Sequence, residues 1–171
     1  MKIVTLLKSV LHLQKDFLDS IPEKLYTQKK PILKEPTIGE QVRHILDFFE
    51  NIWVAIDSDY DMVINLSCRR RNSSLNYSYA HARAETKLFI QIFDRMIFDK
   101  DMEFLVYRES RDEMYYETLE NLFTELYSHV VHHHYALKLL VLLRTSIEIN
   151  FPENFAKEVT TIEYEQKSIE K

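Results

Sequence analysis

The sequence predicts an all-α protein: an up-and-down four-helix bundle with a long loop after the second helix and an extended carboxy-terminal tail. Apolar residues recur at helical spacing over four long segments, which loops connect. The chain has 171 residues, of which 46% are hydrophobic and 12% aromatic, which is enough to bury a core and excludes disorder. Its length fits one domain, so we expect residues 1–171 to form a single bundle.

The first two predicted helices have clear ends. An apolar stripe runs through residues 2–20 and stops before Pro22. After a polar linker, Thr37 stands as an N-cap three residues before Glu40, which is the capping-box pattern. The stripe of this second helix consists of Ile38, Val42, Ile45, Phe49, Ile52 and Ile56.

The rest of the chain is less regular. Residues 57–76 mix acids, arginines, Ser and Asn without a steady period, which predicts a long loop. We expect a third helix over 77–98, a short strand at 102–107, a fourth helix over 113–149 and a packed, extended tail after Pro152. The predicted inner face of the third helix consists of Ala80, Ala84, Leu88, Ile92 and Met96.

Composition excludes several classes of function. The formal net charge is −5 and the basic clusters are isolated, so we expect no nucleic-acid partner. Gly39 is the only glycine, which excludes the nucleotide-binding loops of Walker and Rossmann proteins. Charges interrupt the amino-terminal apolar run, no uncharged run approaches the ~20 residues of a membrane span, and Cys68 is the only cysteine. We therefore expect a cytoplasmic protein that binds no membrane.

The stretch SHVVHHHYALKLL, residues 128–140, holds four of the seven histidines. On a helical wheel with Leu126 at zero, the apolar stripe spans roughly −60° to +60°, with His129 at about −60° and His133 at about −20°. Such an i, i+4 pair of imidazoles can hold one cation; the other interpretation is two core histidines that each need a polar partner. His132 and His134 are expected to be solvated, or to support the ligands from outside.

A third ligand must come from another segment. His44 lies at the flank of the second helix's stripe, where a side chain can point between helices. His81, with Glu85 one turn later, is expected on the inner side of the third helix and competes for the same role. Periodicity leaves both candidates open.

Four stretches, in order, carry a resemblance: TIGEQVRHILDFFENIW, then DYD with CRRRN, then HVVHH, then FPENFAKEVTTIEY. They resemble the DinB-like or YfiT-like metalloprotein superfamily, in the branch common among Bacteroidetes, over nearly the whole chain. The usual forms there are SIGqHvRHi on the second helix, a Tyr-Asp followed by an Arg-x-Arg loop, EHxxHHxA on the last helix and a closing FGxAxSTIxY.

The resemblance implies a divalent metal, nickel or zinc, held by His44, His129 and His133. The chain departs from the family pattern in three places. Ser128 replaces an acid, Ala156 replaces a glycine, and HHHYAL is one residue longer than HHxAL. The longer run allows a one-step shift in which His134 becomes a ligand, but that shift breaks the i, i+4 pair, so the unshifted assignment is preferred.

Three neutral imidazoles leave at least one coordination position open, which is typical of catalytic or substrate-binding metals. The resemblance implies a metal-dependent enzyme, thiol S-transferase-like or hydrolase-like, that acts on a small molecule such as a low-molecular-weight thiol. Tyr60, Arg69 and Arg71 are candidates for binding an anionic substrate group, or else the loop is clamped by its own salt bridges. The inner position of Arg144 predicts a carboxylate partner. The alternative function is a non-catalytic helical module, a stress-related homodimer whose histidines are a relic or a structural metal clamp.

Overall fold

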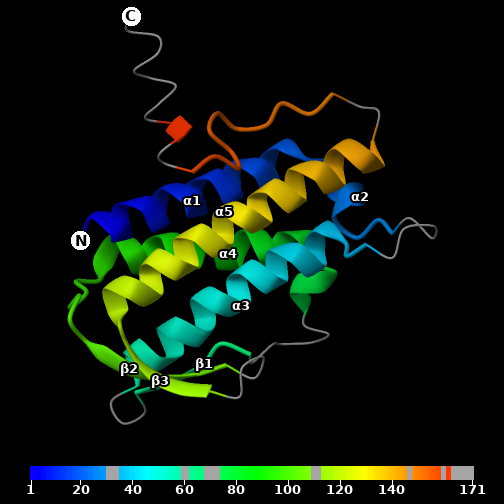
Figure 1. Cartoon of the computed structure of the whole chain (residues 1–171). Coiled ribbons are helices and arrows are strands. Elements are labelled where there is room, and N and C mark those ends of the chain that lie inside the picture. Colours follow the sequence, from blue (N-terminus) through cyan, green and yellow to red (C-terminus); the bar gives the residue numbers. More distant parts are fainter. Residues whose placement is uncertain are drawn as a thin grey trace, which may run out of the picture.

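The computed structural model of the chain describes residues 1–29, 35–58, 62–67, 74–108, 113–145, 148–158 and 161–162. Within these ranges the long helices are α1 (Lys2–Ser20), α3 (Ile38–Asp57), α4 (Tyr79–Arg95) and α5 (Leu119–Arg144), packed around one apolar core (Figure 1). The shorter elements are α2 (Glu23–Tyr26), the 3-10 turn η1 (Ser74–Asn76), and the strands β1 (Val63–Asn65), β2 (Glu103–Arg108) and β3 (Glu113–Thr118). No helix of the described part combines the length and apolarity needed to cross a membrane.

The long helices do not alternate in direction. Gly39, at the start of α3, lies against Asn76, which precedes α4, and Phe49 in the middle of α3 contacts Phe93 near the end of α4. These two neighbouring helices are therefore parallel, as Figure 1 also shows. The predicted up-and-down connectivity is wrong, because parallel neighbours need a connection that returns along the length of the bundle. The connection between α3 and α4, which contains β1 and η1, makes that crossover.

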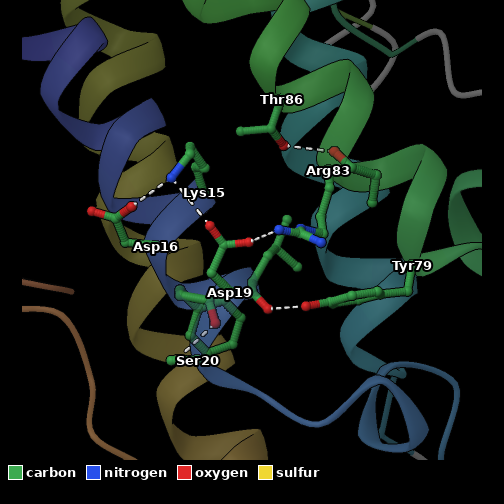
Figure 2. Close-up of polar contacts among 10 residues, drawn as sticks. Lys15, Asp16, Asp19, Ser20, Tyr79, Arg83 and Thr86 are labelled. Atoms are coloured by element: carbon green, nitrogen blue, oxygen red, sulfur yellow. Dashed lines mark hydrogen bonds and ion pairs between the residues drawn. The ribbon is translucent and has the colours of Figure 1, made fainter.

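In contrast, α1 and α4 are antiparallel, and polar contacts join the end of α1 to the start of α4 (Figure 2). Asp19 forms ion pairs with Lys15, at 3.1 Å, and with Arg83. The hydroxyl of Tyr79 donates to the carbonyl of Leu18. Burial raises the pKa of Asp19, but the hydrogen bond from Lys15 and the charge of Arg83 outweigh it, so this pKa lies below its ordinary value.

A three-stranded sheet lies at one end of the bundle, in the order β1-β2-β3 (Figure 1). β1 and β2 are parallel, β2 and β3 antiparallel, and the buried side chains of Phe104 and Val106 attach β2 to the core. The strand predicted at 102–107 is confirmed, but the all-α prediction is only approximately right. The fourth long helix begins at Leu119 and not at 113, because residues 113–118 (EMYYET) pair with β2 and Thr118 caps the helix through the N–H of Asn121.

α3 begins where the sequence predicts. The side chain of Thr37 accepts from the N–H of Glu40 at 3.0 Å, and the Glu40 carboxylate accepts from the N–H of Thr37 at 2.8 Å. Arg43 then pairs with Asp47 at 2.6 Å and donates to the side chain of Asn76 at 2.8 Å, which fixes the end of the crossover to α3. The predicted stripe is confirmed: Ile38, Val42, Ile45, Phe49 and Ile52 are buried, and Ile56 partly so.

The buried face of α4 is not the predicted one. Ala80, Ala84 and Leu88 are exposed, the last by 52%. Both sides of α4 carry apolar residues, and the side with the larger aromatic rings packs inward because it buries more apolar surface. The buried residues are Ala82, Glu85, Thr86, Phe89, Ile90 and Phe93.

After α5 the chain packs on α1 and α5, as predicted for the tail, but residues 153–156 form turns and are not extended. The ring of Phe155, which is 2% exposed, stacks on Phe17 with 4.7 Å between centroids and on His134 with 4.6 Å. The turn that brings it there places Asn154 at φ 63° and Ala156 at φ 66°. This left-handed region favours glycine, the residue that the family pattern has in place of Ala156.

Candidate metal centre

Three histidines from two antiparallel helices meet between α3 and α5. The ring centroids of His129 and His133, one turn apart on α5, are 4.4 Å apart. The ring of His44 on α3 lies 5.1 Å from His129 and 4.6 Å from His133. One donor nitrogen from each histidine lies within 4.8 Å of the other two, and all three side chains are partly buried. The structure thus brings together the three histidines that the resemblance selected.

Two α3 residues that the sequence patterns did not single out contact the α5 pair. The amide oxygen of Gln41 lies 2.7 Å from Nδ1 of His133. This oxygen can only accept, so Nδ1 of His133 carries the proton and Nε2 keeps its lone pair for a ligand. The ring of Phe48 stacks on His129 with 4.0 Å between centroids. The i, i+3, i+7 spacing of Gln41, His44 and Phe48 is the signal that could have found them, and Gln41 stands where SIGqHvRHi has its other histidine.

α5 buries a wider arc than its stripe predicts. On the same wheel its buried residues extend from about −40° to about +140°. His134, at about +80°, is completely buried, so the prediction that it is solvated is wrong, and neither of its ring nitrogens has a hydrogen bond to a described residue through which it could support a ligand. Its ring stacks on Phe155, and burial together with His133 lowers the pKa of His134 to about 3. The segment after α5 covers this side of the helix. The spacing of apolar residues within α5 cannot predict this contact, because it involves a distant part of the chain.

The shifted assignment with His134 as ligand also fails, because His134 is not among the residues whose donor atoms converge. His132 is exposed, as predicted. His81 is not on the inner side of α4 as expected: its side chain is 47% exposed and lies 2.5 Å from the hydroxyl of Ser74.

Arg144 is buried, and the hydrogen bonds that the described residues show for its side chain go to carbonyl oxygens. Its guanidinium donates to the backbone carbonyls of Gln28 at 2.6 Å and Pro36 at 2.7 Å. Among the described residues no carboxylate lies within ion-pair distance of Arg144, but the charges of Glu35 and Glu40 partly offset the lowering of its pKa by burial. The candidate substrate-binding residues Tyr60, Arg69 and Arg71 lie outside the described residues.

The donor set fits a divalent transition-metal ion. Imidazole nitrogen is a common ligand of zinc and nickel, and Nδ1 of His44 and Nε2 of His129 are shielded from solvent. The donor atoms lie within 4.8 Å of one another, so small rotations of the rings would let all three hold one ion. Three protein ligands leave a fourth position for a small molecule.

Among solved structures, the chain is similar to the crystal structure of a DinB-like protein, YjoA, from Bacillus subtilis. The TM-score is 0.56 at 20% sequence identity, and the match covers 88% of this chain and 97% of that chain. This chain has the DinB-like fold. At such low identity the likeness to the DinB-like protein concerns the fold alone. No family model and no curated protein matches the sequence.

Proposed function

We propose that the protein is a cytoplasmic, divalent-metal-dependent enzyme of the DinB-like or YfiT-like superfamily, in its Bacteroidetes-type branch. Nickel or zinc is held by His44, His129 and His133, and the reaction is thiol S-transfer or hydrolysis of a small molecule. The observation that supports this is the convergence of three imidazole nitrogens within 4.8 Å, from helices far apart in the sequence.

The chain's own residues prepare this site before any substrate arrives. Gln41 fixes the tautomer of His133, and Phe48 fixes the plane of His129, so both donor lone pairs are held in place. The chemistry that a bound divalent ion supplies is Lewis acidity, which lowers the pKa of a water or thiol that shares its coordination sphere. Tyr60, Arg69 and Arg71 are proposed, from the sequence, to bind an anionic group of the substrate.

Metal analysis of protein purified without a chelator or a histidine tag tests the ligand set. We expect about one nickel or zinc per chain, and none after His44→Ala or His133→Ala. The matched control is His132→Ala, which removes an exposed histidine from the same turn and should keep the metal. Gln41→Ala should weaken affinity by about 10- to 100-fold in a chelator competition, because it frees the ring of His133 to rotate.

Replacing the metal by cobalt then distinguishes an enzyme with an open coordination position from a protein with a structural or vestigial metal site. If the open position accepts substrate, adding a small thiol to the cobalt protein should produce a thiolate charge-transfer band that His132→Ala leaves unchanged. A chain that takes up no metal even after reconstitution would instead be the non-catalytic helical module. Metal without an accessible fourth position would indicate a structural clamp.

A further inference from the structure

The inner face of the β2–β3 hairpin carries polar side chains that neither the core nor the three-histidine site uses. This face is turned toward the bundle, because Phe104 and Val106 of β2 are buried on it. Arg108 follows Val106 by two residues and so lies on the same face, and Tyr115 is the cross-strand partner of Val106. Between the hairpin and the first two turns of α5 is a cleft of about 500 Å³, lined by Arg108, Glu113, Met114, Tyr115, Glu117 and Glu125.

The cleft lies beside the candidate metal centre. Figure 1 shows the hairpin at the end of the bundle where α5 begins. Glu125, in the wall of the cleft, precedes His129 by one turn of α5, and His133 follows one turn later. Side chains four residues apart on a helix are neighbours, with about 6 Å between their Cβ atoms. One helical turn therefore separates the cleft from the first α5 ligand.

Arg108 is held in the cleft as a fixed cation. Its Nε donates to the hydroxyl of Tyr115 at 2.6 Å, and its Nη2 forms an ion pair with Glu125. Burial lowers the pKa of Arg108, but the hydrogen bond and the charge of Glu125 outweigh this effect, so the pKa lies above its ordinary value. The contacts with described residues use Nε and Nη2, so Nη1 can donate to a ligand, as can the hydroxyl of Tyr115. Guanidinium and phenol donors side by side suit a carboxylate.

The glutamates of the cleft suit a cation on the same ligand. One carboxylate oxygen of Glu117 accepts from the N–H of Thr118 at 3.1 Å and from the side-chain amide of Asn121 at 2.7 Å, which fixes its orientation. Its other oxygen, and the second oxygen of Glu125, can accept from an ammonium group. Because the carboxylates outnumber the guanidinium, a ligand that carries both charges fits the cleft better than a simple anion does.

We propose that this cleft binds the zwitterionic head group of an α-amino acid, with its carboxylate on Arg108 and Tyr115 and its ammonium on Glu117 and Glu125. That the head group belongs to the substrate of the three-histidine site rests on the proposed function, whereas its binding in the cleft does not. Arg108 is then a specificity-determining residue, which selects amino acids and their derivatives and directs the rest of the ligand toward His129.

Nuclear magnetic resonance titration of the chelator-treated full chain with L-norleucine tests the binding without a metal. Norleucine carries the head group on a plain alkyl chain. We expect the amide signals of β2 and β3 to shift, with a dissociation constant on the order of 0.1–1 mM. N-acetyl-L-norleucine, which lacks the ammonium, and L-norleucine methyl ester, which lacks the carboxylate, should each bind at least about 10-fold more weakly.

Variants locate the binding. Arg108→Gln should weaken it by about 10- to 100-fold, and Tyr115→Phe, which removes only a hydroxyl, by about 2- to 10-fold. The matched control is Arg95→Gln, which removes an exposed arginine of α4 and should bind norleucine as the wild type does. Far-UV circular dichroism verifies that the variants remain folded. Signals that norleucine does not shift, a derivative that binds as tightly as norleucine, or wild-type affinity in Arg108→Gln would overturn the proposal.

The cobalt protein tests the link to the metal centre. The signals of norleucine should broaden, because the cleft lies on the order of 10 Å from a paramagnetic ion held by the histidines. His133→Ala should abolish the broadening and keep the binding, and Arg108→Gln should abolish both. Broadening that survives in Arg108→Gln, or binding without broadening in protein that holds cobalt, would overturn the assignment of the cleft to the substrate. A chain that binds norleucine but takes up no cobalt would confirm the head-group site and refute the proposed metal-dependent function.

Discussion

The buried ring of His134 makes the stability of the fold depend on pH. Its pKa in the folded chain is about 3, whereas an unfolded histidine titrates near 6.5. Between these values the unfolded chain binds a proton that the folded chain does not. The free energy of unfolding therefore falls as the pH drops from about 6.5 toward 3.

Replacing His134 by Leu should remove this dependence. Leucine has a similar volume and no titrating group, so between pH 7 and pH 5 the wild type should lose about 2 kcal/mol more than the variant. Urea unfolding of chelator-treated protein at both pH values measures the difference. The exposed His12→Gln variant should follow the wild type, and equal losses in His134→Leu and wild type would refute the assignment.

Ala156 stores strain in the turn after α5. A non-glycine residue in the left-handed region costs on the order of 1–2 kcal/mol, and Ala156 has φ 66°. Ala156→Gly should raise the free energy of unfolding by about 0.5–1 kcal/mol after the added flexibility of the unfolded chain is counted. Ala84→Gly, in the exposed face of α4, should lower it by about 1 kcal/mol. Losses of similar size in both variants would show that the turn is not strained.

Among the elements, the start of α3 depends on a close approach of two backbones. A Cβ on Gly39 would lie 2.3 Å from the carbonyl oxygen of Asn76 and 2.8 Å from the ring of Tyr26. In a solvent-exposed helix, Gly→Ala raises the free energy of unfolding by about 1 kcal/mol. At Gly39 the close contact should instead lower the free energy of unfolding by about 1–3 kcal/mol. Chemical denaturation of Gly39→Ala measures the change, and a gain in stability would show that the two backbones separate easily.

Helix ends and strands can be predicted from the sequence where the residues that cause them are neighbours in the chain. The capping box of Thr37 and Glu40 and the alternation at 102–107 involve only neighbouring residues, so they survive folding unchanged. The strand at 113–118 was missed because its reason to be extended is the partner strand β2, not its own pattern. The face of α4 was misassigned because both of its sides are apolar, and packing against Phe49 decides between them.

For the whole molecule, the crossover connection between α3 and α4 decides which helices are neighbours. It makes α3 parallel to α4 and leaves α3 antiparallel to α5, so His44 lies opposite the α5 pair. The same return path lays β1 beside β2 at one end of the bundle. The position of the site therefore depends on the order in which the helices are connected as well as on the spacing of the histidines along each helix.

The carboxy-terminal segment completes the core at the other side of α5. Phe155→Ala removes a ring that stacks on both Phe17 and His134, so it should lower the free energy of unfolding by about 3–5 kcal/mol. Tyr116→Ala, which truncates an aromatic side chain that is 73% exposed on β3, should change it by less than about 1 kcal/mol. Thermal and urea unfolding measure both. Similar small effects would mean that the segment is dispensable for the fold.

The sequence by itself determined the positions of α1 and α3, the helical class of the fold and, through its resemblance, the three histidines that converge. Only the tertiary structure decided that His134 is buried, that α3 and α4 are parallel, and which face of α4 packs inward. The physical reason is that spacing along a helix records which residues share a face. Which neighbour covers that face depends on contacts between residues far apart in the chain.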